Sequence, residues 1–225
     1  MNYHISTAPI FKEFTPDCEC PMCKLEKITV ENVLFQFLND AVMEDDTRAR
    51  VNKLGFCAEH FDMLFSRQNK LSVALQSITR MNTLQNEITT AKDVKSAKKQ
   101  AEKLKKLSST CIICDIVDDH MRRYAETVAQ LYASDKDFVK QLNETKGFCL
   151  KHYTLLLERS SLAGFKAKAY LNDLTRIENE NFERLKKEVQ WFCDKHDYRN
   201  REKPLGTSAD ALPRTRIKLY GEKKI

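Results

Sequence analysis

The chain has 225 residues, of which 42% are hydrophobic and 31% are charged, with a formal net charge of +6. This length can build one large or two small hydrophobic cores, so small size does not explain the eight cysteines. No window approaches the roughly 18 apolar residues of a membrane span, and no export signal opens the chain. We therefore expect a cytoplasmic protein with no membrane partner. In that reducing compartment, closely spaced cysteines favour metal binding or redox catalysis over structural disulfides.

The first predicted helix follows the motif CPMC at Cys20–Cys23, after an N-terminal arm of residues 1–17. Its apolar side chains recur at the spacing of one helical face. They are Leu25, Ile28, Phe35, Leu38 and Val42. A charged turn, MEDDTRAR, and the motif GFCAEH come next.

Neither glycine nor proline occurs between Gly55 and Gly147. For so long a stretch this absence predicts helix throughout, and it makes the expected fold class all-α. Apolar residues from Leu71 to Leu107 recur near the helical period, which predicts one long amphipathic helix with lysines on its far side.

A second set of elements follows the motif CIIC at Cys111–Cys114. It contains an amphipathic helix from Val117 to Leu131, the turn ASDKDF and the motif GFCLKH. A second long helix is predicted from Leu171 to Phe192. The helical pattern stops after Asp197, so we expect an irregular tail.

The two sets form an internal repeat. From the first cysteine to the histidine the offset is 40 residues in one copy and 41 in the other, as a tandem duplication with drift would produce. We therefore divide the chain into the arm 1–17, a first repeat 18–107, a second repeat 108–196 and a basic tail 197–225. Each repeat is expected to be a helical hairpin plus a long helix, clamped by a Cys/Cys/Cys/His metal site.

Three thiolates and one imidazole are an established ligand set for tetrahedral zinc. The first repeat offers Cys20, Cys23, Cys57 and His60, and the second offers Cys111, Cys114, Cys149 and His152. We predict one zinc ion in each repeat, with an iron–sulfur cluster as the less favoured alternative. The glycine before each CxxH pair, Gly55 or Gly147, allows the backbone to turn sharply before the helix begins.

Chain length sets a condition on this pairing. A helix from Lys24 to about Val42 advances ~28 Å at ~1.5 Å per residue, so the following residues must return the same distance. The return segment is therefore predicted to lie antiparallel along the first helix, with the metal at the base of the hairpin.

Other uses of the cysteines and histidines are less favoured. A thioredoxin-like role for CPMC requires a βαβ context, and no strand pattern is present. Cys18 lies beside the first CxxC motif and could substitute as a ligand, but it is interpreted, like Cys193, as a spare thiol. Glu59 lies between two candidate ligands, but its counterpart in the second repeat is Lys151, so no duplicated catalytic base is identified.

The motifs that carry a family resemblance are CPMC…GFCAEH, CIIC…GFCLKH, HDYRN and KLYG. Through them the chain resembles an uncharacterised family of bacterial proteins, common in Clostridia-type anaerobes, that is known only as a domain of unknown function. The resemblance covers nearly the whole chain. It implies a helical, intracellular, metal-binding protein and supplies no catalytic residue.

Three functions remain open. The first is a non-enzymatic, zinc-stabilised scaffold that binds another protein. The second is a thiol or metal sensor in which oxidation at Cys20/Cys23 or Cys111/Cys114 releases the metal. The third is nucleic-acid binding through the basic segments 92–106 and 214–224, although no docking motif accompanies them and a lysine run is usually a solvated helix face.

Overall fold

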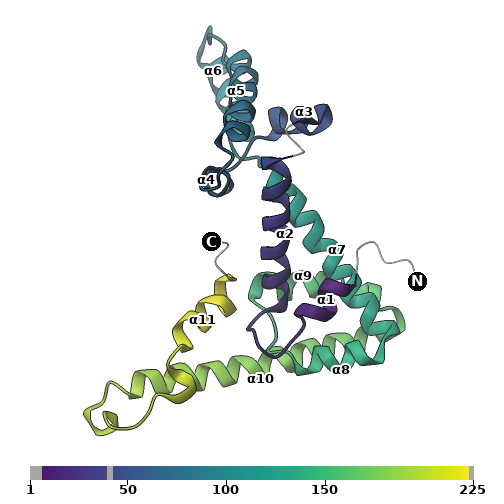
Figure 1. Ribbon diagram of the computed structural model, residues 1–225, viewed down its shortest axis with the longest axis vertical. Helices are drawn as coiled ribbons and strands as arrows, with labels where there is room; N and C mark the ends of the chain where they lie inside the picture. Colours follow the sequence, from purple (N-terminus) through teal and green to yellow (C-terminus); the bar gives the residue numbers. More distant parts are fainter. Residues whose placement is uncertain (1–6, 40–42, 223–225) are drawn as a thin grey trace. The chain divides into compact units, whose positions relative to one another are not determined.

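The structure is a computed structural model that describes residues 7–39 and 43–222 (Figure 1). Every regular element in those residues is a helix, which confirms the all-α class. No helix within the same ranges is long and apolar enough to cross a membrane. A short helix, α1 (Ala8–Glu13), lies in the predicted arm. Val42, the predicted end of the first long helix, lies outside the described residues.

The two CxxC motifs are each followed by five α-helices in the same order. The first series is α2 (Pro21–Leu38), α3 (Asp45–Leu54), α4 (Ala58–Phe65), α5 (Lys70–Glu87) and α6 (Val94–Ser108). The second series is α7 (Ile112–Ser134), α8 (Lys136–Glu144), α9 (Leu150–Glu158), α10 (Ala167–Asp194) and α11 (Ala211–Tyr220). Short 3₁₀ segments η2 (Ser160–Lys166), η3 (Tyr198–Asn200) and η4 (Gly206–Ser208) complete the second series.

The helices form two compact units that do not coincide with the sequence repeats. The terminal unit contains the described chain up to Lys27 together with the chain from His120 onward, and the central unit is Ile28–Asp119. The chain passes from one unit to the other within α2 and again within α7. Each of these helices therefore begins in one unit and ends in the other.

The predicted long helix from Leu71 to Leu107 is wrong, because α5 and α6 are separate helices. Ile88, Thr89 and Thr90 are β-branched and disfavour helix at this point. Asp93 then starts α6 with a capping box, in which its carboxylate accepts from the Ser96 amide at 2.7 Å. The absence of glycine and proline allows helix through 88–93 but does not require it.

The tail is more ordered than predicted. It contains α11, in which Pro213 lies in the first turn, where a missing N–H costs no internal hydrogen bond. Gly221 ends the helix with φ +83°, a common helix stop. Neither Pro213 nor Gly221 therefore prevents a helix in the tail that was predicted to be irregular. Residues 223 and 224 of the predicted basic segment lie outside the described chain.

Each unit has its own aromatic core. In the terminal unit the ring of Phe14 packs against the rings of Phe138 and Phe148, with centroids 5.4 and 6.0 Å away. In the central unit Phe37 and Phe56 make an edge-to-face contact at 5.7 Å. Phe56 and Phe148 are the aromatic residues of the two GFC motifs, so both motifs anchor their metal-ligand segment to a core.

Both GFC glycines occupy positions that a larger residue would not tolerate. Gly55 and Gly147 have φ of +66° and +78°, which confirms the predicted sharp turn. A Cβ at Gly147 would lie 2.6 Å from Glu178 Oε2 and 2.8 Å from Lys218 Nζ. A Cβ at Gly55 would lie 2.9 Å from Arg80 Nε. In each unit the glycine therefore makes room for a charged side chain.

Replacing Gly147 by alanine should lower the free energy of unfolding by about 3 kcal/mol, because the new Cβ adds backbone strain and collides with the Lys218–Glu178 ion pair. Gly164 is the matched control: its φ is +56° but nothing lies within 4 Å of its Cβ position. Gly164→Ala should cost about 1 kcal/mol. Denaturant titration of both variants measures the difference, and equal losses would contradict the steric argument.

Candidate metal sites

The structure gathers all eight predicted ligands into two clusters. Cys20, Cys23, Cys149 and His152 form the terminal site, and Cys57, His60, Cys111 and Cys114 form the central site. In each cluster the four candidate ligand atoms lie within 4.8 Å of one another. Each cluster belongs wholly to one unit. The arrangement can hold one metal ion per unit.

The predicted pairing within each repeat is wrong. In the terminal site the CxxC pair of the first repeat meets the CxxH pair of the second repeat. In the central site the CxxC pair of the second repeat meets the CxxH pair of the first repeat. Chain geometry accords with the exchange: α2 advances about 27 Å, whereas α3, the α-helix described between α2 and Cys57, advances about 15 Å. The return segment does not bring Cys57 back to Cys23. Instead, α2 and α7 each carry the chain into the unit where the other repeat began.

Distances between the ligand atoms match a single tetrahedral ion. Bonds of about 2.3 Å to sulfur and about 2.0 Å to nitrogen place tetrahedral ligands about 3.8 Å apart for two sulfurs and about 3.5 Å apart for sulfur and nitrogen. In the terminal site Cys23 Sγ lies 3.7 Å from Cys149 Sγ and 3.4 Å from His152 Nδ1. In the central site Cys57 Sγ lies 3.9 Å from Cys114 Sγ, and Cys114 Sγ lies 3.3 Å from His60 Nδ1.

All four ligand pairs occupy the first turn of a helix. Cys57 and Cys149 are the N-cap residues of α4 and α9, and Cys20 and Cys111 directly precede α2 and α7. The second ligand of each pair comes three residues later, so both side chains lie on one face of the first turn. The positive end of the helix dipole and the free amides there stabilise a thiolate.

The three thiols of the terminal site have very different pKa values. Hydrogen bonds with Cys20 and Cys23 hold the pKa of Cys149 well below its usual range. The hydrogen bond to Cys149 raises the pKa of Cys23 to about 12, and burial raises the pKa of Cys20. The raised pKa values favour the protonated thiols of Cys20 and Cys23. A cation that binds all three sulfurs must displace protons, so its affinity increases with pH.

A carboxylate lies behind the histidine of the terminal site. With Nδ1 directed at the cysteines, the other ring nitrogen of His152 lies 3.5 Å from Glu26 Oε2. Glu26 is buried and also accepts a hydrogen bond from Lys151 Nζ at 2.8 Å. A hydrogen bond from the ring nitrogen to this carboxylate would orient the imidazole and make it a better ligand. Sequence reasoning missed Glu26, although its position one turn after Cys23 on a predicted helix was a usable signal.

The end of α11 closes the terminal site. The Glu222 amide donates to Cys23 Sγ at 3.4 Å, and the Cβ position of Gly221 lies 3.9 Å from both Cys23 Sγ and Cys149 Sγ. Amide donation to a thiolate stabilises its charge. The segment predicted as an irregular tail therefore contributes a backbone donor to the site.

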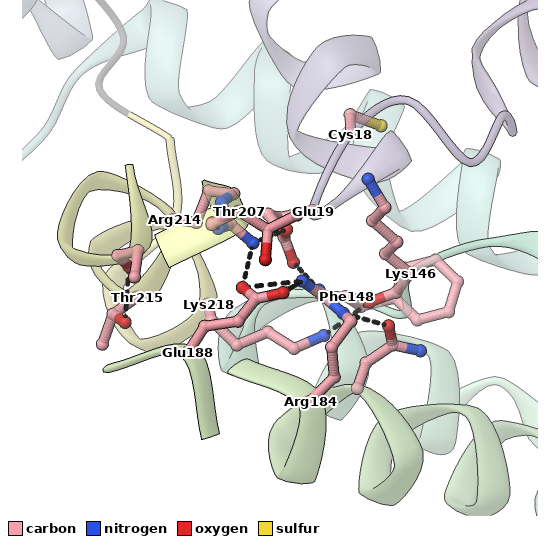
Figure 2. A network of polar contacts seen from close by, with 12 residues as sticks. Cys18, Glu19, Lys146, Phe148, Arg184, Glu188, Thr207, Arg214, Thr215 and Lys218 are labelled. Atoms are coloured by element: carbon pink, nitrogen blue, oxygen red, sulfur yellow. Dashed lines mark hydrogen bonds and ion pairs between the residues drawn. The ribbon is translucent and has the colours of Figure 1, made fainter. Parts of the chain in front are cut away.

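Ion pairs hold α11 in place, as Figure 2 shows. Arg214 on α11 pairs with Glu188 on α10 and with buried Glu19, the residue that directly precedes the ligand Cys20. Arg184 pairs with the same two carboxylates, at 2.6 Å to Glu19. The buried carboxylate of Glu19 is thus paired with one arginine on each of two sides.

A buried lysine completes the attachment of α11. Lys218 is 1% exposed, lies 3.1 Å from Glu178 Oε1 and donates to the Lys146 carbonyl at 2.9 Å. Glu178 in turn accepts from the Phe148 amide at 2.9 Å. In the central unit Arg80 has the corresponding position, donating to the Asn52 and Lys53 carbonyls. A cation thus caps the helix before each GFC motif.

The two sites differ in exposure. All four ligands of the terminal site are buried, whereas Cys57 and Cys114 of the central site are partly exposed. Of the remaining thiols, Cys193 is exposed and Cys18 is partly buried. Neither belongs to a cluster, as expected for spare thiols.

The described residues are all-helical in their regular elements and carry two Cys₃His clusters, which makes the chain a candidate metal-binding protein. The chain belongs to the Family of unknown function (DUF6062), whose family model matches residues 1–224. This confirms the resemblance to a domain-of-unknown-function family. No curated protein and no solved structure matches the chain.

The exchanged pairing gives a distinctive prediction for Cys149→Ser. Loss of this ligand should lower the metal content from two ions per chain to one, and it should expose Cys20 and Cys23 to alkylation. Cys111 and Cys114 should stay protected, although they belong to the same repeat as Cys149. Metal analysis with peptide mapping of the labelled thiols measures both effects. Labelling of Cys111 and Cys114 instead would show that the ligands pair within one repeat.

Proposed function

We propose that the protein is a non-enzymatic scaffold, held in shape by two zinc ions, that binds another protein. The observation that carries this proposal is the closed ligand set: in each unit three sulfurs and one imidazole nitrogen lie at tetrahedral distances. A zinc ion with four protein ligands has no open position for a water or a substrate. Its contribution is then to folding.

Zinc fits the donor sets better than an iron–sulfur cluster. In a cluster the four protein ligands bind more than one iron, which separates them more widely than ligands on one ion. Here every ligand atom lies within 4.8 Å of the other three in its site. Thiolate and imidazole in a tetrahedron are also the preferred surroundings of zinc.

The chain separation of the ligands indicates how much the metal contributes to stability. Each site has two half-sites, a CxxC pair and a CxxH pair. Along the chain these are 126 to 132 residues apart in the terminal site and 51 to 57 residues apart in the central site. A covalent cross-link closing loops of these lengths would stabilise the fold by about 5 and about 4 kcal/mol through chain entropy. Both ions together would fasten the first repeat to the second.

Metal analysis of the purified protein tests the proposal. We expect two zinc ions per chain, with Cys18 and Cys193 as the reactive thiols, and loss of helical circular dichroism when a strong chelator removes the metal. Serine at Cys193, which lies outside both sites, is the matched control and should retain two zinc ions. Iron in place of zinc, or full helicity with no metal and eight reactive thiols, would overturn the proposal.

A thiol-responsive sensor is the second candidate, and the partial exposure of Cys57 and Cys114 favours it. Peroxide reaches exposed thiols first, so mild oxidation should release one zinc from the central site and form a disulfide there, while the buried terminal site keeps its ion. Zinc release with a colorimetric chelator and mass mapping of disulfides measure this. Retention of both ions would count against the sensor, as would simultaneous loss.

The contacts of α11 weaken the nucleic-acid alternative. Arg214 is engaged by Glu188, Glu19 and Asp210, and Lys218 is buried. Two of the five basic residues of segment 214–224 are therefore committed to internal pairs and cannot contact phosphate without breaking them.

A further inference from the structure

Helix α5 is amphipathic in the inverted sense: its polar face is buried in the central unit. Ser72 Oγ donates to the Leu38 carbonyl at 2.8 Å, Gln76 Nε2 to the Phe37 carbonyl at 2.9 Å, and Arg80 to the Asn52 carbonyl at 2.6 Å. These are carbonyls at the C-terminal ends of α2 and α3, which have no partner inside their own helices. The buried side of α5 therefore serves as a set of polar caps.

The opposite face of α5 is apolar and exposed. Leu71, Leu75 and Ile78 are spaced as one helical stripe, and Met81 continues its edge. Leu71 is 69% exposed, Ile78 56% and Met81 67%. Of the 17 large hydrophobic residues that are exposed in the described chain, 11 lie in the central unit. A soluble helix normally turns this stripe inward, so its exposure indicates an interaction surface.

A cleft of about 560 Å³ adjoins the stripe between α5 and α6. Met81, Leu84 and Ile88 line it from α5, and Leu104 and Leu107 line it from α6. Phe61, from the helix that carries His60, forms part of the wall. Met81 belongs to both the stripe and the cleft, so the two form one continuous apolar surface.

The charge beside this surface is strongly positive. Residues 70–108 carry nine Lys and Arg against three acidic residues, a net charge equal to the +6 of the whole chain. The six lysines of α6 are all exposed. If a second copy of the chain docked through the same surface, two positively charged segments 70–108 would face each other and repel. An apolar stripe beside a basic helix instead complements a partner that is apolar on one side and acidic on its flanks.

We propose that the α5 stripe and the adjoining cleft bind an acidic amphipathic helix of a partner protein. The proposal rests on the scaffold function above and names the class of its partner. Apolar side chains at i, i+3 or i+4 and i+7 of that helix lie along the stripe, one large side chain enters the cleft, and flanking carboxylates face the lysines of α6. A bilayer surface presents no projecting side chain to fill the cleft, which favours a protein helix over an anionic membrane.

Three fluorescent model peptides test the proposal against the zinc-loaded full-length protein by fluorescence anisotropy. The first is a helical peptide with a leucine stripe and glutamate flanks, the second replaces glutamate by lysine, and the third replaces leucine by serine. We expect the acidic leucine peptide to bind at least about tenfold more tightly than the other two. Its affinity should fall several-fold as salt rises from about 50 to about 300 mM.

Protein variants locate the binding. The double change Leu75→Ser and Ile78→Ser should weaken binding of the acidic peptide at least about tenfold, and Lys98→Glu with Lys105→Glu should weaken it while lowering the salt dependence. The matched control is Phe165→Ser, which alters a side chain that is 92% exposed in the terminal unit and should leave binding unchanged. All altered side chains are exposed, and zinc content verifies that each variant folds.

Several outcomes would overturn the proposal. They are equal binding of the acidic and basic peptides, no loss in the Leu75/Ile78 variant, binding of anionic vesicles that the acidic peptide does not displace, and self-association that Ile78→Ser abolishes. If two zinc ions are retained but the acidic peptide does not bind, only the docking proposal fails. If the purified protein holds no zinc, the scaffold proposal fails first.

Discussion

Convergence of three thiols and one imidazole on a single point is the constraint that organises each unit. Two helix N-termini must meet there, because each ligand pair occupies the first turn of its helix and the dipoles of both helices favour negative sulfur. The turn before the CxxH helix needs a glycine, and the charged groups packed on that glycine bind the last carbonyls of the preceding helix. Phenylalanine next to the glycine anchors the same segment in an aromatic core. The GFC motif thus combines a turn, an anchor and a ligand in three residues.

Local features of this chain could be predicted from its sequence, whereas the choice of partners could not. The eight ligand positions follow from spacing along one helical face, which depends only on neighbouring residues. The two half-sites of each kind are chemically equivalent, so nothing local distinguishes Cys149 from Cys57 as the partner of Cys23. The choice depends on the path of the whole chain, in which α2 and α7 each pass from one unit to the other. The break at 88–93 and helix α11 were missed because β-branched residues and a capping box stop a helix as effectively as glycine does, while proline in a first turn does not.

The duplicated motif has diverged into two different surroundings. In the terminal unit α11 lies over the site, attached by Arg214 and Lys218, and its last residues donate an amide to Cys23. In the central unit the fifth helix, α6, is highly exposed and two of the ligand thiols are accessible. One site is therefore sealed, whereas the other leaves two of its three sulfur atoms partly exposed and lies in a unit with an open apolar helix face. Any exchange of metal, oxidant or partner is expected to involve the central unit first.

Exchange of half-sites has a consequence for the history of the chain. A single repeat carries a CxxC pair and a CxxH pair that do not reach each other, so by itself it could complete its coordination only with a second identical molecule. Two such molecules would form a reciprocal homodimer with two equivalent sites, each using one half from either subunit. Gene fusion of that dimer would give the present chain, with the short link from α6 to α7 replacing a concentration-dependent encounter by an intramolecular one. Such a fusion would leave the two halves free to differ.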